Sequence, residues 1–113
     1  MDPERMRYLS VSIVEFLDDY QPGIVACEFK DAGGEVHRIE DKVPIFTLEM
    51  LNRDSKYPGP GTAACELLSI STDKDGRNLV EITFERPDGL EATSGQVTFV
   101  VLESQLNTSC GEN

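Results

Sequence analysis

Basic residues are scarce in this sequence, and histidine is almost missing. The 113 residues hold 10 Lys and Arg against 21 Asp and Glu, so the formal net charge is −11. A field of this sign repels nucleic-acid phosphates and anionic lipid headgroups, so we expect no binding to nucleic acid or to membrane surfaces. His37 is the only histidine, which excludes a metal site built from several imidazoles. We therefore predict neither a metal site nor a cofactor.

Long apolar runs and paired cysteines are missing as well. The longest apolar runs, such as VTFVVL at residues 97–102, are far shorter than the roughly 20 residues that cross a bilayer as a helix. Cys27, Cys65 and Cys110 are an odd set without CxxC spacing, and no apolar leader precedes the first strand-like pattern. We therefore expect a cytoplasmic protein with reduced thiols.

Catalytic signatures are also absent. The sequence contains no GxSxG, P-loop, HExxH or GxGxxG motif. DKDG at residues 73–76 matches the start of a calcium-binding loop, but Phe84 occupies the position at which an EF-hand needs Glu. Asp73 and Asp75 are therefore interpreted as turn residues that bind local backbone NH groups. An enzyme is the less favoured class of function.

Short segments of alternating apolar and polar residues run through the chain, separated by turns rich in Gly, Pro and Asp. Such segments are typical of antiparallel strands, and the length suits a single domain. We predict an all-β fold, a small antiparallel β-barrel or sandwich of about six to seven strands with at most one short helical turn. The predicted strands cover residues 8–16, 24–30, 35–41, 61–72, 78–85 and 96–103.

The remaining segments complete the predicted domain. Pro44 marks residues 42–47 as an edge or a strand end, and residues 48–53 are long enough for about one helical turn. We expect residues 1–7 to be frayed, residues 8–106 to form the barrel and residues 107–113 to form a loose tail.

The hairpin over residues 24–41 has a predictable register. DAGG at residues 31–34 suits a three-residue loop with a glycine bulge, which places Phe29 beside His37 on the face that also carries Cys27. A Cys27–His37 pair at the barrel mouth is therefore an alternative ligand or catalytic site. A nucleophilic cysteine needs an electropositive, partly exposed setting, so a buried structural thiol is the favoured interpretation of Cys27.

A second hairpin follows the loop at residues 54–61. Its apolar alternation changes face near Leu67 and Leu68, which predicts a β-bulge there. With that bulge, the predicted core consists of Leu9, Val11, Ile13, Val25, Cys27, Phe29, Ile39, Ile70, Val80, Ile82, Phe84, Val97, Phe99 and Val101.

Aromatic residues lie beside carboxylates at several predicted strand ends and loops. Aromatic side chains rimmed by negative charge suit recognition of a basic protein surface. Tyr8 and Phe46 belong to the same pattern. The candidate protein-binding residues are Asp18, Asp19, Tyr20, Glu40, Asp41 and Tyr57.

Three stretches of the sequence carry a resemblance: FLDDYQPGIVACEFKDAGGEVHRIEDKVPIF, YPGPGTAACEL and ERPDGLEATSGQVTFVVLESQL. Together, over residues 6–106, the chain resembles a family of short bacterial cytoplasmic proteins of unassigned function. The resemblance implies a bacterial single-domain protein with no known cofactor and carries no binding motif. Immunity proteins, which neutralise toxins, share its small size and acidity.

Two hypotheses follow. The first is a non-enzymatic module that binds another protein, with a basic toxin as one candidate partner. The alternative is a small-ligand-binding protein or enzyme that uses the barrel mouth near Cys27 and His37. The sequence leaves the oligomeric state open.

Overall fold

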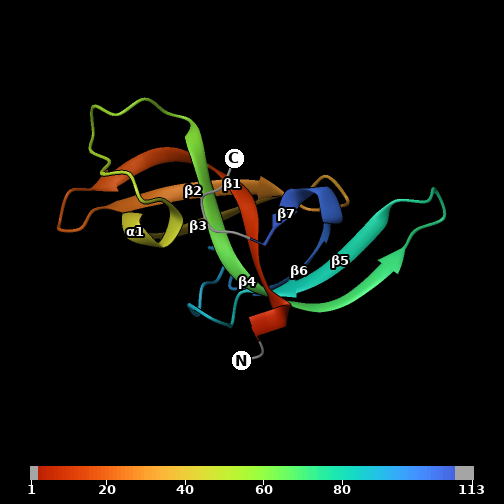
Figure 1. Ribbon diagram of the computed structural model, residues 1–113. Helices are drawn as coiled ribbons and strands as arrows, with labels where there is room; N and C mark the ends of the chain where they lie inside the picture. The colour runs from red at the N-terminus through yellow and green to blue at the C-terminus, as the bar shows by residue number, and fades with distance from the viewer. Residues whose placement is uncertain (1–2, 109–113) are drawn as a thin grey trace.

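The computed structural model describes residues 3–108, which form a single antiparallel sheet (Figure 1). The seven strands have the order β3–β2–β1–β4–β5–β6, and β7 pairs with β1. The predicted all-β class, the strand number and the single short helical turn are confirmed. The elements are η1 (Pro3–Arg5), β1 (Met6–Asp18), β2 (Ile24–Lys30), β3 (Val36–Lys42), α1 (Val43–Phe46), β4 (Gly59–Thr72), β5 (Asn78–Thr83), β6 (Thr98–Leu102), η2 (Glu103–Gln105) and β7 (Leu106–Asn107).

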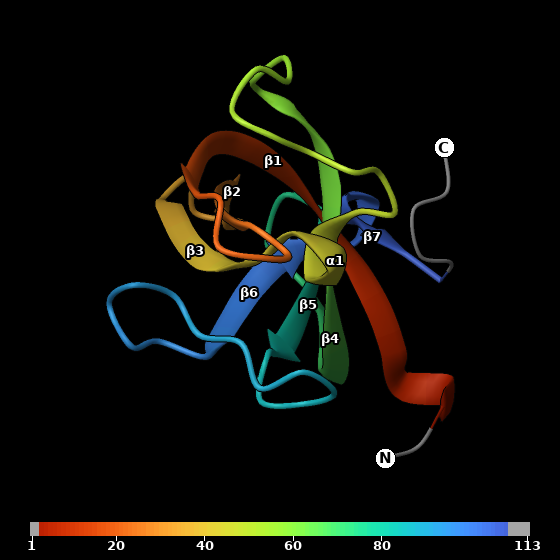
Figure 2. The same cartoon turned by 90° about the vertical axis from the view of Figure 1, so that its left-hand side faces the viewer.

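The sheet curls into a half-barrel because β1 and β4 are long and bent (Figures 1 and 2). The first part of β1 pairs with β4, and its second part pairs with β2. Two register shifts interrupt the second pairing, after Ile13 and after Phe16. Such irregularities increase the local twist of a strand. One curled sheet therefore encloses the core. Of the two predicted architectures, the fold resembles the barrel and not the sandwich, which would need two sheets.

Most of the predicted core is buried on the inner face of this sheet. Two predicted members differ: Val97 is half-buried and Ile70 is 59% exposed. The predicted bulge is present as a register shift between Leu67 and Ser69. It leaves Ile70 directly opposite the buried Val80. Both residues belong to the β4–β5 hairpin, whose far end projects beyond the body of the sheet (Figure 1). Facing inward was therefore not enough to bury Ile70.

The helical turn lies earlier than predicted. It spans Val43–Phe46, with Pro44 in its first turn, whereas the predicted turn at residues 48–53 is non-helical. Proline suits the first turn of a helix because its missing NH has no helical partner there. Phe46, expected at the surface, is buried in the core. α1 thus lies across one end of the curled sheet (Figure 2).

The segment between β5 and β6 contributes to the core although it is not a strand. Leu90 and Ala92 are buried. The backbone NH of Phe84 donates to Val97 at 2.8 Å, and the NH of Thr93 donates to the Arg38 carbonyl of β3 at 2.8 Å. This loop therefore connects the two edges of the sheet and completes the core.

The ends of the described chain are also paired. β1 begins at Met6, and Met6 and Arg7 pair with β4, so ordered structure starts before the predicted Tyr8. β7 pairs with β1 through Leu106 and Asn107. Residues 109–113 of the predicted tail, Cys110 included, lie outside the described residues. Within residues 3–108, no helix has the length and apolarity needed to span a bilayer.

Candidate functional site

The turn between β1 and β2 carries the first predicted binding residues. Oδ1 of Asp18 accepts a hydrogen bond from the NH of Tyr20 at 2.9 Å, and the Tyr20 carbonyl accepts one from Gly23 at 2.8 Å. Gly23 has a φ of 97°, which favours glycine. These bonds fix the backbone and leave Asp18, Asp19 and Tyr20 exposed, with Tyr20 81% exposed.

The loop over residues 47–58 adds apolar side chains that sequence reasoning did not select. Leu48 is 89% exposed and Met50 is 95% exposed. The loop itself is held by hydrogen bonds, among them one of 2.6 Å from the Tyr57 hydroxyl to the Asn52 carbonyl. Scattered exposed apolar residues are common on proteins, but a cluster marks an interaction site.

This loop and the β1–β2 turn share one hollow. It has a volume of about 430 Å³, and Asp19, Leu48 and Met50 are among the residues that line it. The NH of Val43 donates to the Gly23 carbonyl at 2.9 Å, which ties α1 to the turn. We define the docking surface as Asp18, Asp19, Tyr20, Leu48 and Met50. It lies at the α1 end of the sheet (Figure 2).

The other three predicted binding residues have different surroundings. Asp41 is half-buried near the end of β3 and accepts a hydrogen bond from the Lys42 NH at 2.8 Å. Glu40 is exposed and accepts a hydrogen bond from Arg38 at 2.9 Å. Tyr57 is partly buried against the core. The structure therefore brings Asp18, Asp19 and Tyr20 together and gives Glu40 and Tyr57 local structural contacts.

Cys27, the first residue of the alternative site, is fully buried in the core. Burial raises the pKa of its thiol to about 12, although the positive charge of Arg38 acts in the opposite direction. The thiol is therefore protonated at neutral pH and is a poor nucleophile. Cys27 pairs with Ile39, while Phe29 pairs with His37 as predicted. The predicted register is confirmed.

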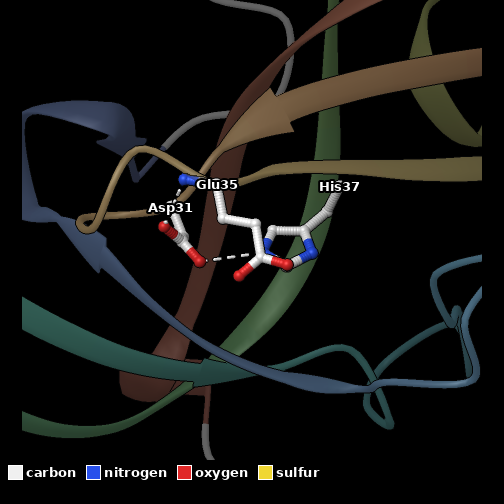
Figure 3. A group of neighbouring side chains, drawn as sticks. All are labelled: Asp31, Glu35 and His37. Carbon is white, nitrogen blue, oxygen red and sulfur yellow. Dashed lines mark hydrogen bonds and ion pairs between the residues drawn. The ribbon is translucent and has the colours of Figure 1, made fainter.

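His37 points toward the β2–β3 turn rather than toward Cys27. Its imidazole packs against the rings of Phe29 and Phe99, with centroids 5.3 Å and 4.6 Å away. Its Nε2 lies 2.8 Å from Oδ2 of Asp31, and the ring is buried. Figure 3 shows the Asp31 and Glu35 carboxylates beside this ring. These two acids were not predicted as site residues, because Asp31 was interpreted as part of the DAGG turn and Glu35 as the first residue of the following strand.

Asp31 organises the turn around this histidine. Oδ1 of Asp31 accepts hydrogen bonds from the NH groups of Gly33 at 2.9 Å and Glu35 at 3.0 Å. Partial burial raises the pKa of Asp31, but the hydrogen bonds from His37, Glu35 and Gly33 outweigh it and hold the pKa below its usual value. Asp31 and Glu35 line an open hollow of about 560 Å³ next to β6.

Comparisons with protein-family models, with curated proteins and with solved structures found no match to this chain.

Proposed function

We propose that this protein is a non-enzymatic module that binds a basic protein through the docking surface. The observation that supports the proposal is the exposure of Leu48 and Met50 at a hollow that Asp19 also lines, with the exposed ring of Tyr20 on the residue that follows Asp19. Large apolar side chains on a rigid backbone, beside carboxylates, match the composition of protein-binding surfaces.

The charge of the chain supports a basic partner. The net charge of −11 belongs to a domain of 113 residues, and a field of that sign steers positively charged partners toward the surface. Asp18 and Asp19 place two of these charges beside the exposed ring of Tyr20. A basic toxin neutralised by this surface is one candidate partner.

The setting of the thiols supports a reducing cytoplasm as the place of binding. Cys27 and Cys65 are both free and buried. Because disulfides are rare in the cytoplasm, free thiols are compatible with that compartment.

The proposal is tested with three forms of the full-length chain. The first is the wild type, and the second combines Leu48→Ser with Met50→Ser, which removes the apolar side chains of the docking surface. The third combines Asp18→Lys with Asp19→Lys. The serine variant should unfold at a denaturant concentration close to that of the wild type, because exposed positions contribute little to stability. The lysine variant loses the hydrogen bond from the Tyr20 NH to Asp18 and should be less stable by about 0.5 to 1.5 kcal/mol while remaining folded.

A partner captured from cells by the wild type should be lost with the serine variant. Stopped-flow association of that purified partner should slow as salt rises, since screening acts over about 8 to 10 Å near physiological ionic strength. Association should also be slower with the lysine variant than with the wild type. A matched control, Asp75→Lys with Asp88→Lys, changes the net charge equally at exposed sites outside the docking surface and should slow association less. Equal effects of the two lysine variants, or unchanged capture by the serine variant, would overturn the proposal.

A further inference from the structure

We propose that Asp31, Glu35 and His37 bind a divalent transition-metal ion of the Zn²⁺ type. One potential ligand atom from each of the three side chains lies within 4.8 Å of the other two. Figure 3 shows the two carboxylates and the imidazole gathered at the β2–β3 turn. This site is at the opposite end of the β2–β3 hairpin from the docking surface, so the inference goes beyond the proposed function and does not depend on it.

The distances require only a small adjustment to hold an ion. Zinc binds imidazole nitrogen at about 2.0 to 2.1 Å and carboxylate oxygen at about 2.0 to 2.2 Å, so two tetrahedral ligands lie roughly 3.3 Å apart. Nε2 of His37 and Oδ2 of Asp31 are 2.8 Å apart. They need to separate by roughly half an ångström to receive the ion between them. The exposed side chain of Glu35 can turn to supply the third ligand.

Two of the ligands are already oriented by their neighbours. The Gly33 and Glu35 NH groups hold Oδ1 of Asp31, which directs Oδ2 toward His37. The rings of Phe29 and Phe99 hold the imidazole on its other sides. Metal sites depend on such outer contacts to orient their ligands. The cluster therefore needs little ordering before it binds.

The ligand set also selects the class of ion. Imidazole suits zinc and its neighbours among the transition metals, whereas Mg²⁺ and Ca²⁺ prefer oxygen ligands alone. The two carboxylates balance the charge of a divalent ion, and the net charge of −11 attracts cations. Three protein ligands beside an open hollow leave room for a water in the fourth position.

Metal binding fixes which nitrogen of the His37 ring carries a hydrogen. Nε2 must present its lone pair to the metal, so a proton that Nε2 shares with Asp31 is released to solvent. The neutral ring that binds the metal then carries its hydrogen on Nδ1. His37 is the only histidine in the chain, so the imidazole nitrogen signals of an isotope-labelled sample report on this site alone.

The test is a Zn²⁺ titration of the full chain carrying Cys110→Ser, which removes a competing thiol ligand. The imidazole ¹⁵N signals should move to those of the metal-bound Nδ1–H form and stop changing at one equivalent. Mg²⁺ at the same concentrations should leave them in place. Unmoved signals in excess Zn²⁺, or an equal response to Mg²⁺, would overturn the site.

A matched pair of variants tests the ligands. Glu35→Gln removes one ligand at an exposed position. Loss of an outer contact of a metal site already lowers metal affinity by about 10- to 100-fold, so loss of a ligand should weaken Zn²⁺ affinity by at least about 10-fold. The melting temperature of Glu35→Gln without zinc should equal that of the parent. Glu91→Gln, at another exposed position, should leave the affinity unchanged. Equal affinities for Glu35→Gln and the parent would contradict the proposal, as would an equal loss in Glu91→Gln.

Discussion

Nε2 of His37 lies 2.8 Å from Oδ2 of Asp31, so a buried imidazole is tied directly to the turn that joins β2 to β3. The same carboxylate accepts two backbone hydrogen bonds within that turn. Removing one group therefore affects both the hairpin and the aromatic cluster behind it.

Asp31→Asn should lower the free energy of unfolding at pH 7 by about 1.5 to 3 kcal/mol, the range for hydrogen bonds to a charged group. The pKa of Asp31 is below its usual value in the folded protein. Its stabilising contribution is therefore complete above the unfolded-state pKa of about 3.9 and is lost as the pH falls through the lower folded-state value. Urea unfolding followed by circular dichroism at pH 7, 5 and 3 checks this. A difference between the two proteins that is unchanged at pH 3 would contradict it.

Replacing each of the two buried cysteines with serine should lower the free energy of unfolding by different amounts. Burial raises the pKa of Cys27 and of Cys65 to about 12, so neither should react with a thiol reagent at pH 8 unless the protein unfolds. Sγ of Cys65 lies 3.5 Å from the Arg7 carbonyl, which can accept a hydrogen bond from a serine hydroxyl. Cys27→Ser buries a hydroxyl among apolar neighbours and should cost about 1 to 3 kcal/mol. Cys65→Ser should cost less, and the reverse order in denaturant unfolding would be inconsistent with these contacts.

Gly61 is packed so tightly that a Cβ atom at this position would clash with its neighbours. A Cβ on Gly61 would lie 2.9 Å from Cδ1 of Ile13 and 3.1 Å from the Phe46 carbonyl oxygen. Gly61→Ala should therefore lower stability by about 1 to 3 kcal/mol, as overpacking of a core does. The control is Gly59→Ala, whose Cβ would lie 3.5 Å from the nearest atom, the Lys56 carbonyl oxygen. Thermal unfolding that places Gly61→Ala at or above Gly59→Ala would refute this account.

The β4–β5 hairpin offers a comparison between paired positions. Ile70 and Val80 are direct cross-strand partners, yet Ile70 is exposed and Val80 is buried. Thr keeps the β-branched shape at both sites. Ile70→Thr should change the unfolding free energy by no more than about 0.5 kcal/mol, while Val80→Thr should cost about 1 to 3 kcal/mol through its buried hydroxyl. Similar losses in urea unfolding would mean that Ile70 is covered in solution.

Local patterns were sufficient to predict the strands and the register of the β2–β3 hairpin. Alternation identifies the inner face, and the DAGG turn sets which residues lie opposite each other, so Phe29 and His37 were placed correctly. Patterns could not predict burial where it depends on distant segments. Ile70 lies on the same face of the sheet as the buried Val80, but no other segment of the described chain buries it. Leu90 is buried although it belongs to a loop whose sequence is weakly hydrophobic.

The candidate sites were predicted in part, for similar reasons. Asp18 and Tyr20 lie in a turn that the sequence marks clearly. Leu48 and Met50 were missed because residues 48–53 were expected to form a helical turn, and the sequence alone does not show whether an apolar residue there is buried or exposed. Glu35 was missed because its closeness to His37 follows from the fold of the turn.

The tight packing around Gly61 also restricts how related sequences can diverge. A relative with any other residue there would need a smaller side chain in place of Ile13 and a shifted α1 backbone, two changes that must arise together. We therefore expect distant relatives to keep a glycine at this strand position even where the surrounding sequence has changed beyond recognition.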